Sequence, residues 1–103
     1  MSNINYYPDW RQQIIYGANG PQPAILMADE KAKVILAGLE PDQRISEHPE
    51  AAAVYLFLDG QGWMTVDGER LFVSTGTTIT MPAGAVRGLE AETRLAFLAM
   101  RIA

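Results

Sequence analysis

The chain has 103 residues, 49% of them hydrophobic, and this length suits one compact domain over residues 1–103. Its formal net charge is -4 at pH 7 and its basic residues are not clustered, which argues against a nucleic-acid-binding surface. Cysteine is absent, so disulfides, thiolate nucleophiles and sulfur-rich metal sites are excluded.

Glycine and proline divide the chain into short apolar runs, and this pattern predicts an all-β structure. Residues 1–23 end in a Gly- and Pro-rich loop and are expected to form an N-terminal arm that packs on the domain. A short strand over residues 24–27 and a turn precede a strand over residues 32–39, which is apolar on both faces. Residues 40–52 are more polar and are expected to form a bend.

The strongest strand prediction covers residues 53–58, which are rich in aromatic and aliphatic side chains. Residues 63–66 and 70–73 flank Asp67-Gly68, a dipeptide that favours a type I′ turn, so they predict an antiparallel hairpin. Further strands are expected over residues 77–81, 85–89 and 94–102. About eight short strands in so small a chain bury their apolar faces best as a sandwich or a small barrel.

Turn residues in the second half of the chain follow a recognisable order: Gly60, Asp67-Gly68, Gly76 and Pro82-Ala83-Gly84. Each has a backbone role, because glycine accepts a positive φ and proline presets a turn. In this order and spacing, residues 39–101 resemble the cupin superfamily. The resemblance implies a small jelly-roll β-barrel, the cupin-like double-stranded β-helix.

The metal-binding positions of the two cupin motifs carry other residues in this chain. In the first motif two histidines and a glutamate precede a glycine. Counting back from Gly60 places Ala53 at the glutamate, His48 at the second histidine and Ser46 at the first. Counting from the proline-glycine turn of the second motif places Arg87 at the third histidine. In the family, these four positions hold a divalent transition metal.

The three replacements cannot bind that metal, because alanine has no donor atom, a serine hydroxyl is a poor ligand and a guanidinium has no free lone pair. We therefore predict a lost metal site and no cofactor. A divalent metal held by His48 is the less favoured reading. Glu50 could share a strand face with His48 if that segment is extended, but two ligands are fewer than the roughly three of catalytic sites.

The candidate ligand-binding residues are His48, Arg87, Tyr55 and Glu50. Arg87 offers a planar, permanently charged fork that suits a carboxylate or phosphate. Tyr55 shares the face of Ala53 by the two-residue strand period, so it is expected to line the barrel interior. We predict a cupin-fold protein that binds a small anionic molecule in the barrel.

Two other functions are compatible with the sequence. One is a metal-dependent enzyme of the dioxygenase or isomerase type, which would use His48 with non-standard carboxylate ligands. The other is an inert structural or dimerisation module whose barrel is filled. No catalytic residue is assigned, because the chain lacks a nucleophile elbow and any Ser, His and Asp arrangement typical of hydrolases.

The expected partners are a small molecule and a second copy of the chain. Residues 54–58 and 95–100 are apolar on both faces, whereas a strand of a small barrel buries one face, so a homodimer is expected. Residues 1–10 show no basic and apolar leader, and no apolar run is long enough to span a bilayer. We therefore expect a cytoplasmic protein without a membrane or nucleic-acid partner.

Overall fold

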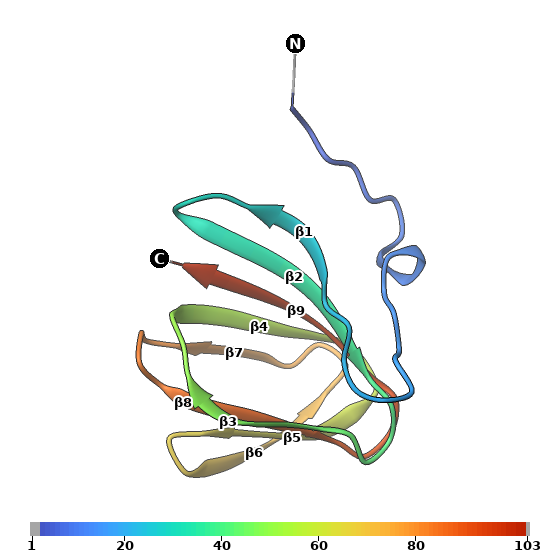
Figure 1. Cartoon of the computed structure of the whole chain (residues 1–103). Coiled ribbons are helices and arrows are strands. Elements are labelled where there is room, and N and C mark those ends of the chain that lie inside the picture. Colours follow the sequence, from blue (N-terminus) through green and yellow to red (C-terminus); the bar gives the residue numbers. More distant parts are fainter. Residues whose placement is uncertain (1–2, 103) are drawn as a thin grey trace.

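Two antiparallel sheets face each other in the computed structural model, which describes residues 3–102 (Figure 1). The elements of this part are η1 (Trp10–Gln12), β1 (Ala24–Ala28), β2 (Ala32–Leu39), β3 (Arg44–Pro49), β4 (Ala52–Asp59), β5 (Gln61–Val66), β6 (Glu69–Ser74), β7 (Thr78–Met81), β8 (Val86–Ala91) and β9 (Leu95–Ile102). One sheet has the order β1-β2-β9-β4-β7 and the other the order β3-β8-β5-β6. This strand order is that of a jelly roll, which confirms the predicted all-β class.

Strand β3 differs from the prediction, which placed a bend over residues 40–52. It pairs with β8, but its register is irregular between Ile45 and His48. Both of these side chains are half-buried, whereas the residues between them are exposed. Because this bulge inserts an extra residue, the apolar alternation that reveals a strand in a sequence is interrupted.

Alternation along β4 builds the interior of the barrel. Ala53, Tyr55 and Phe57 are 2%, 5% and 0% exposed, while the residues between them are only partly covered. The hairpin after β5 turns at Asp67 (φ 49°) and Gly68 (φ 83°), as a type I′ turn requires. The structure therefore confirms the predicted inward face of β4 and the predicted hairpin.

The N-terminal arm contacts the domain at several places and packs tightly on the outside of the five-stranded sheet at Gly38. The ring of Tyr16 lies so close to Gly38 that a Cβ there would collide with it. Arg94 stacks over the same ring at 4.4 Å and donates hydrogen bonds to Glu40, from Nε at 2.7 Å and from Nη2 at 3.2 Å. Further towards the N-terminus, the side chains of Asn5 and Tyr7 donate to the carbonyl oxygen of Leu26 on β1 at 3.4 and 3.1 Å, while Tyr6 remains 81% exposed.

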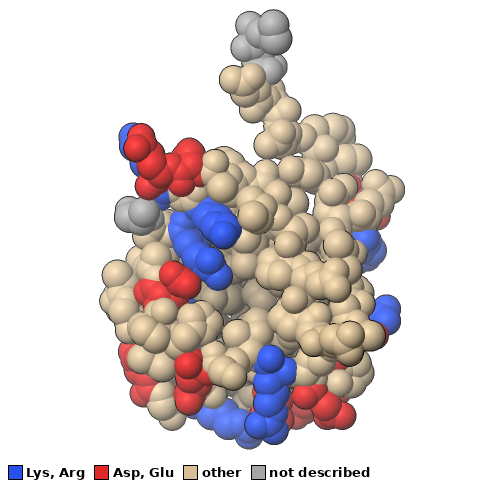
Figure 2. All heavy atoms as spheres, viewed as in Figure 1, with Lys and Arg blue, Asp and Glu red and all other residues tan. Residues whose placement is uncertain are grey.

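Charges of both signs are interspersed on the face drawn in Figure 2, where no extended field of one sign is seen. Ion pairs join side chains of opposite charge in the protein, including Arg44 with Glu90 and Arg94 with Glu40. In the part of the chain that the structure describes, no helix combines the length and apolarity needed to cross a membrane.

Candidate functional site

A cavity of about 270 Å³ lies inside the barrel, and we call it the barrel cavity. Its lining residues are Pro21, Pro23, Ile35, Ala37, Ile45, His48, Tyr55, Met64, Arg87, Gly88, Leu89, Phe97 and Arg101. Only His48, Tyr55, Arg87 and Arg101 among them carry polar side-chain groups. The structure therefore brings three of the four candidate residues together and adds an arginine that the sequence prediction missed.

Arg87 faces the interior from β8 and is 1% exposed. Its Nε donates to the carbonyl oxygen of Ala85 at 3.0 Å, and its Nη2 donates to that of Glu50 at 3.0 Å. Its Nη1 is buried and has no hydrogen-bond partner among the described residues. Two backbone carbonyls thus fix the guanidinium in the wall, while its third nitrogen is left for another acceptor.

Arg101 supplies a second incompletely paired guanidinium. It is the direct register partner of Ala53 on β4 and of Lys33 on β2. Its Nε is buried without a hydrogen-bond partner among the described residues, and its Nη1 lies 4.0 Å from Oε2 of Glu50. The sequence could have predicted that Arg101 faces the interior, because the two-residue period of a strand places residue 101 on the same face of β9 as Phe97.

His48 lies directly opposite Arg87 in the pairing of β3 with β8. Its Nδ1 is 2.9 Å from the carbonyl oxygen of Ser46. Because a carbonyl only accepts, Nδ1 carries a hydrogen in this contact, and Nε2 is the nitrogen left for another partner. The backbone of β3 therefore orients the imidazole.

Tyr55 is 5% exposed and stacks on Phe97, with ring centroids 5.7 Å apart and an interplanar angle of 30°. Both rings line the barrel cavity. Glu50, in contrast, lies beyond the end of β3 and is not part of the cavity lining. Its carbonyl oxygen and its carboxylate contact the two arginines instead, so Glu50 supports cavity residues without lining the cavity, and its role in ligand binding stays a prediction.

The cavity residues do not fit the divalent metal that the cupin resemblance implies. One imidazole stands there beside two guanidinium groups, which offer no lone pair and repel a cation. Ala53 offers no donor, and Ser46 lines a groove on the other side of the sheet. Over residues 3–102, no three His, Cys, Asp or Glu side chains come together as a metal site would require.

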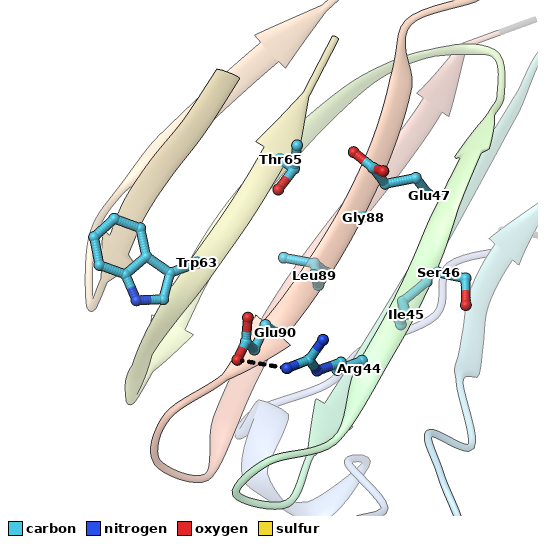
Figure 3. Close-up of a pocket in the computed structure, with 9 residues that line it drawn as sticks. All are labelled: Arg44, Ile45, Ser46, Glu47, Trp63, Thr65, Gly88, Leu89 and Glu90. Carbon is cyan, nitrogen blue, oxygen red and sulfur yellow. Dashed lines mark hydrogen bonds and ion pairs between the residues drawn. The ribbon is translucent and has the colours of Figure 1, made fainter. Parts of the chain in front are cut away.

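A second hollow of about 350 Å³ lies on the outside of the four-stranded sheet, and we call it the outer groove. Its lining residues are Arg44, Ile45, Ser46, Glu47, Trp63, Thr65, Gly88, Leu89 and Glu90 (Figure 3). Several charged and polar side chains on this face form ion pairs or hydrogen bonds with one another. Arg44 and Arg70 approach the two carboxylate oxygens of Glu90 at 3.2 and 3.6 Å, and the indole of Trp63 donates to Glu92 at 2.7 Å.

No protein-family model and no curated protein matches the sequence. Solved structures match its shape. A conserved protein of unknown function from Streptococcus pyogenes has a TM-score of 0.85 and 25% identity, over 98% of this chain and 91% of that one. An RmlC-like cupin from Desulfovibrio desulfuricans has a TM-score of 0.80 and 17% identity, over 99% and 96%. The chain has the cupin fold.

One cupin-fold neighbour is named for an activity. A variant of salicylate 1,2-dioxygenase from Pseudoaminobacter salicylatoxidans has a TM-score of 0.75 and 17% identity, over 82% of this chain and 27% of that enzyme. At such identities the likeness shows the fold and not the chemistry. What this cupin barrel does therefore depends on its own interior side chains.

Proposed function

We propose that this chain binds a small anionic molecule in the barrel cavity, with Arg87 as the principal charged contact. The observation that carries the proposal is the buried Nη1 of Arg87, which has no hydrogen-bond partner among the described residues. Arg101, His48 and Tyr55 supply further polar groups around the same cavity. The anion completes a set of donors that the protein leaves incomplete.

Electrostatics favour an anion at this place. Removing a guanidinium from water is costly unless a counter-charge or full hydrogen bonding compensates it. Among the described residues no carboxylate forms an ion pair with Arg87, and its two bonds go to neutral carbonyl groups. A bound anion supplies the missing negative charge, in surroundings where the attraction is stronger than in water.

The test compares Arg87→Met with Arg44→Met, an arginine removed from the outer groove. Binding of acetate, benzoate, inorganic phosphate and glucose 6-phosphate is measured by isothermal titration calorimetry, and circular dichroism verifies the fold of each variant. We expect at least one of these anions to bind the wild type and Arg44→Met equally. Arg87→Met should bind it about 30-fold or more weakly, since truncating a buried charged partner costs roughly 2 kcal/mol or more. A panel in which no anion distinguishes Arg87→Met from the wild type would refute the proposal.

The proposal includes a homodimer in the cytoplasm. The outward face of the five-stranded sheet carries half-buried apolar side chains on its central strands, among them Val34, Leu56, Leu98 and Met100. Edge strand β1 adds Met27, which pairs with Val34 and is 44% exposed, and a second copy of the chain would cover this surface. The absence of cysteine is compatible with a reducing compartment.

Sedimentation tests the dimer. The wild type should sediment as a dimer at micromolar concentration. Leu98→Lys should shift it to monomer, because a charge would then lie at the centre of the apolar face, whereas Thr65→Lys on the other sheet should leave the dimer intact. A monomeric wild type would overturn this part of the proposal and leave the cavity untouched.

A further inference from the structure

The barrel cavity has a charged end and an apolar end. Arg101 lies opposite Lys33 and Ala53 in the five-stranded sheet, and Arg87 lies opposite His48 in the four-stranded sheet. Glu50 contacts both arginines, since its carbonyl oxygen accepts from Nη2 of Arg87 at 3.0 Å and its carboxylate lies 4.0 Å from Nη1 of Arg101, so the two guanidinium groups lie at the same end of the cavity. The charged end of the cavity is therefore built from both walls of the barrel.

The apolar end lies two residues from Arg87 along β8 and four residues from Arg101 along β9. Leu89 follows Arg87 on the inward face of β8 and pairs with Met64, while Phe97 and Ala37 pair with each other on the opposite sheet. All four residues line the cavity. Phe97 is four residues from Arg101 along β9, a separation of about 13 Å in an extended strand.

We infer that the ligand is a monocarboxylic acid with a compact apolar body, such as a ring or a branched chain, an inference that rests on the proposed anion binding. Two buried N–H donors, Nη1 of Arg87 and Nε of Arg101, are left without partners among the described residues. Two such donors on one cavity suit the two oxygens of a carboxylate, which guanidinium groups bind well. The apolar body then lies against Phe97 and Met64, where its burial favours binding.

Ligands rich in hydroxyl groups fit this lining poorly. The cavity lining contains no Ser, Thr, Asn or Gln, so the several hydroxyls of a sugar phosphate would lose water and find only Tyr55 and His48 as uncharged polar partners. The volume of about 270 Å³ also lies just below the usual range for drug-sized ligands, which favours a small acid. The apolar end is what separates this ligand class from anions in general.

A matched ligand series tests the inference on the wild-type protein. Benzoate and 3-methylbutanoate should each bind at least ~10-fold more tightly than acetate, inorganic phosphate or glucose 6-phosphate, because only they carry an apolar body. Benzyl alcohol has the ring without the charge and should not bind measurably. Equal affinity of benzoate and benzyl alcohol, or tighter binding of either phosphate compound, would overturn the inference.

One variant locates the apolar body. Ala37→Val narrows the apolar end, so benzoate should lose ~10-fold or more in affinity while acetate binds as before. Thr65→Val, on the outer face, should change neither affinity. If Ala37→Val binds benzoate like the wild type, the inference is wrong. If phosphate binding depends on Arg87 while benzoate gains nothing over acetate, the proposed anion binding stands and only this inference falls. If none of the anions binds, both fall.

Discussion

The barrel cavity and the outer groove lie on opposite faces of the same three strands, β3, β8 and β5, and they are similar in volume, at about 270 and 350 Å³. Gly88 and Leu89 line both. The outer groove is the larger, yet its Arg44 pairs with Glu90 and its Trp63 indole donates to Glu92. The cavity retains donors on Arg87 and Arg101 that no described residue satisfies. The feature that distinguishes the proposed binding site from the outer groove is the presence of buried donors without partners among the described residues.

The difference follows from how water treats the two faces. On the outer face, a charge without a protein partner is solvated at little cost, so an ion pair there contributes little to stability. In the interior, a donor without a partner has lost its hydration without gaining a hydrogen bond, so binding of an acceptor there recovers more free energy than it would at the surface. Equivalent substitutions on the two faces should therefore have unequal effects on ligand binding.

The largest effect is expected from adding an acid to the cavity. Ala53→Glu places a carboxylate opposite Arg101, where it competes with the ligand for that guanidinium and repels an anion. We expect benzoate affinity to fall by roughly 100-fold, measured by calorimetry. Thr65→Glu adds the same charge to the outer groove and should change the affinity less than ~2-fold. A similar loss of benzoate affinity in both variants would show that the barrel cavity and the outer groove do not differ in ligand binding.

Removal of the second cavity arginine should have an intermediate effect. Arg101 has 27% of its side chain exposed, so water replaces part of its interaction with the ligand. Arg101→Met is expected to weaken benzoate binding about 10-fold. The matched control is Arg70→Met, which removes an arginine from the outer side of the sheet and should leave the affinity unchanged. Unaltered binding in Arg101→Met would leave Arg87 as the sole guanidinium contact.

Loss of an outer ion pair should have a small effect. Glu90→Gln weakens contacts to Arg44 and Arg70, whose side chains are 70% and 55% exposed. Chemical denaturation should show a change of at most about 1 kcal/mol in the free energy of unfolding, with ligand affinity unaffected. A loss of benzoate binding in this variant would move the site to the outer groove.

The smallest effect is expected from Glu40, which belongs to neither region. Hydrogen bonding from Arg94 lowers the pKa of Glu40 below its usual 4.5. A carboxyl whose pKa is lower in the folded state adds stability above its unfolded pKa and loses it as the pH falls through the folded pKa. Relative to Glu40→Gln, the wild type should be slightly more stable at pH 7, with the difference shrinking below pH 4.5. Denaturation at both pH values measures this, and a difference that grows in acid would contradict it.

The fold was largely readable from the sequence because turn residues and strand alternation act locally. Asp67-Gly68 adopts the expected positive φ values, and the alternation around Tyr55 defines its inward face. Strand β3 was missed because a bulge breaks its alternation. This strand forms because it pairs with β8, which lies about 40 residues further along the chain, and the local sequence pattern of residues 44–49 does not reveal such a pairing.

The candidate site was readable only in part. The spacing of the cupin motifs predicted His48 and Arg87, and the two-residue strand period predicted Tyr55. The structure places all three residues in the lining of one cavity. Arg101 was missed although its strand period pointed inward, because an arginine near a chain end is ordinarily solvated. The role of Glu50 as a backbone acceptor for Arg87 depends on a loop conformation that side-chain patterns do not encode.

The bulge in β3 determines which kind of charge the barrel can accept. Ile45 pairs with Leu89 and His48 pairs with Arg87, so one extra residue is accommodated between them. In a regular ladder Glu47 would take the place opposite Arg87 and would point inward, while His48 would turn to solvent. The Glu47 carboxylate would then neutralise Arg87, and an anionic ligand would gain little from contacting it. One extra backbone residue thus keeps the Glu47 carboxylate out of the interior and leaves Arg87 without an internal counter-ion, which is the condition for the proposed anion binding.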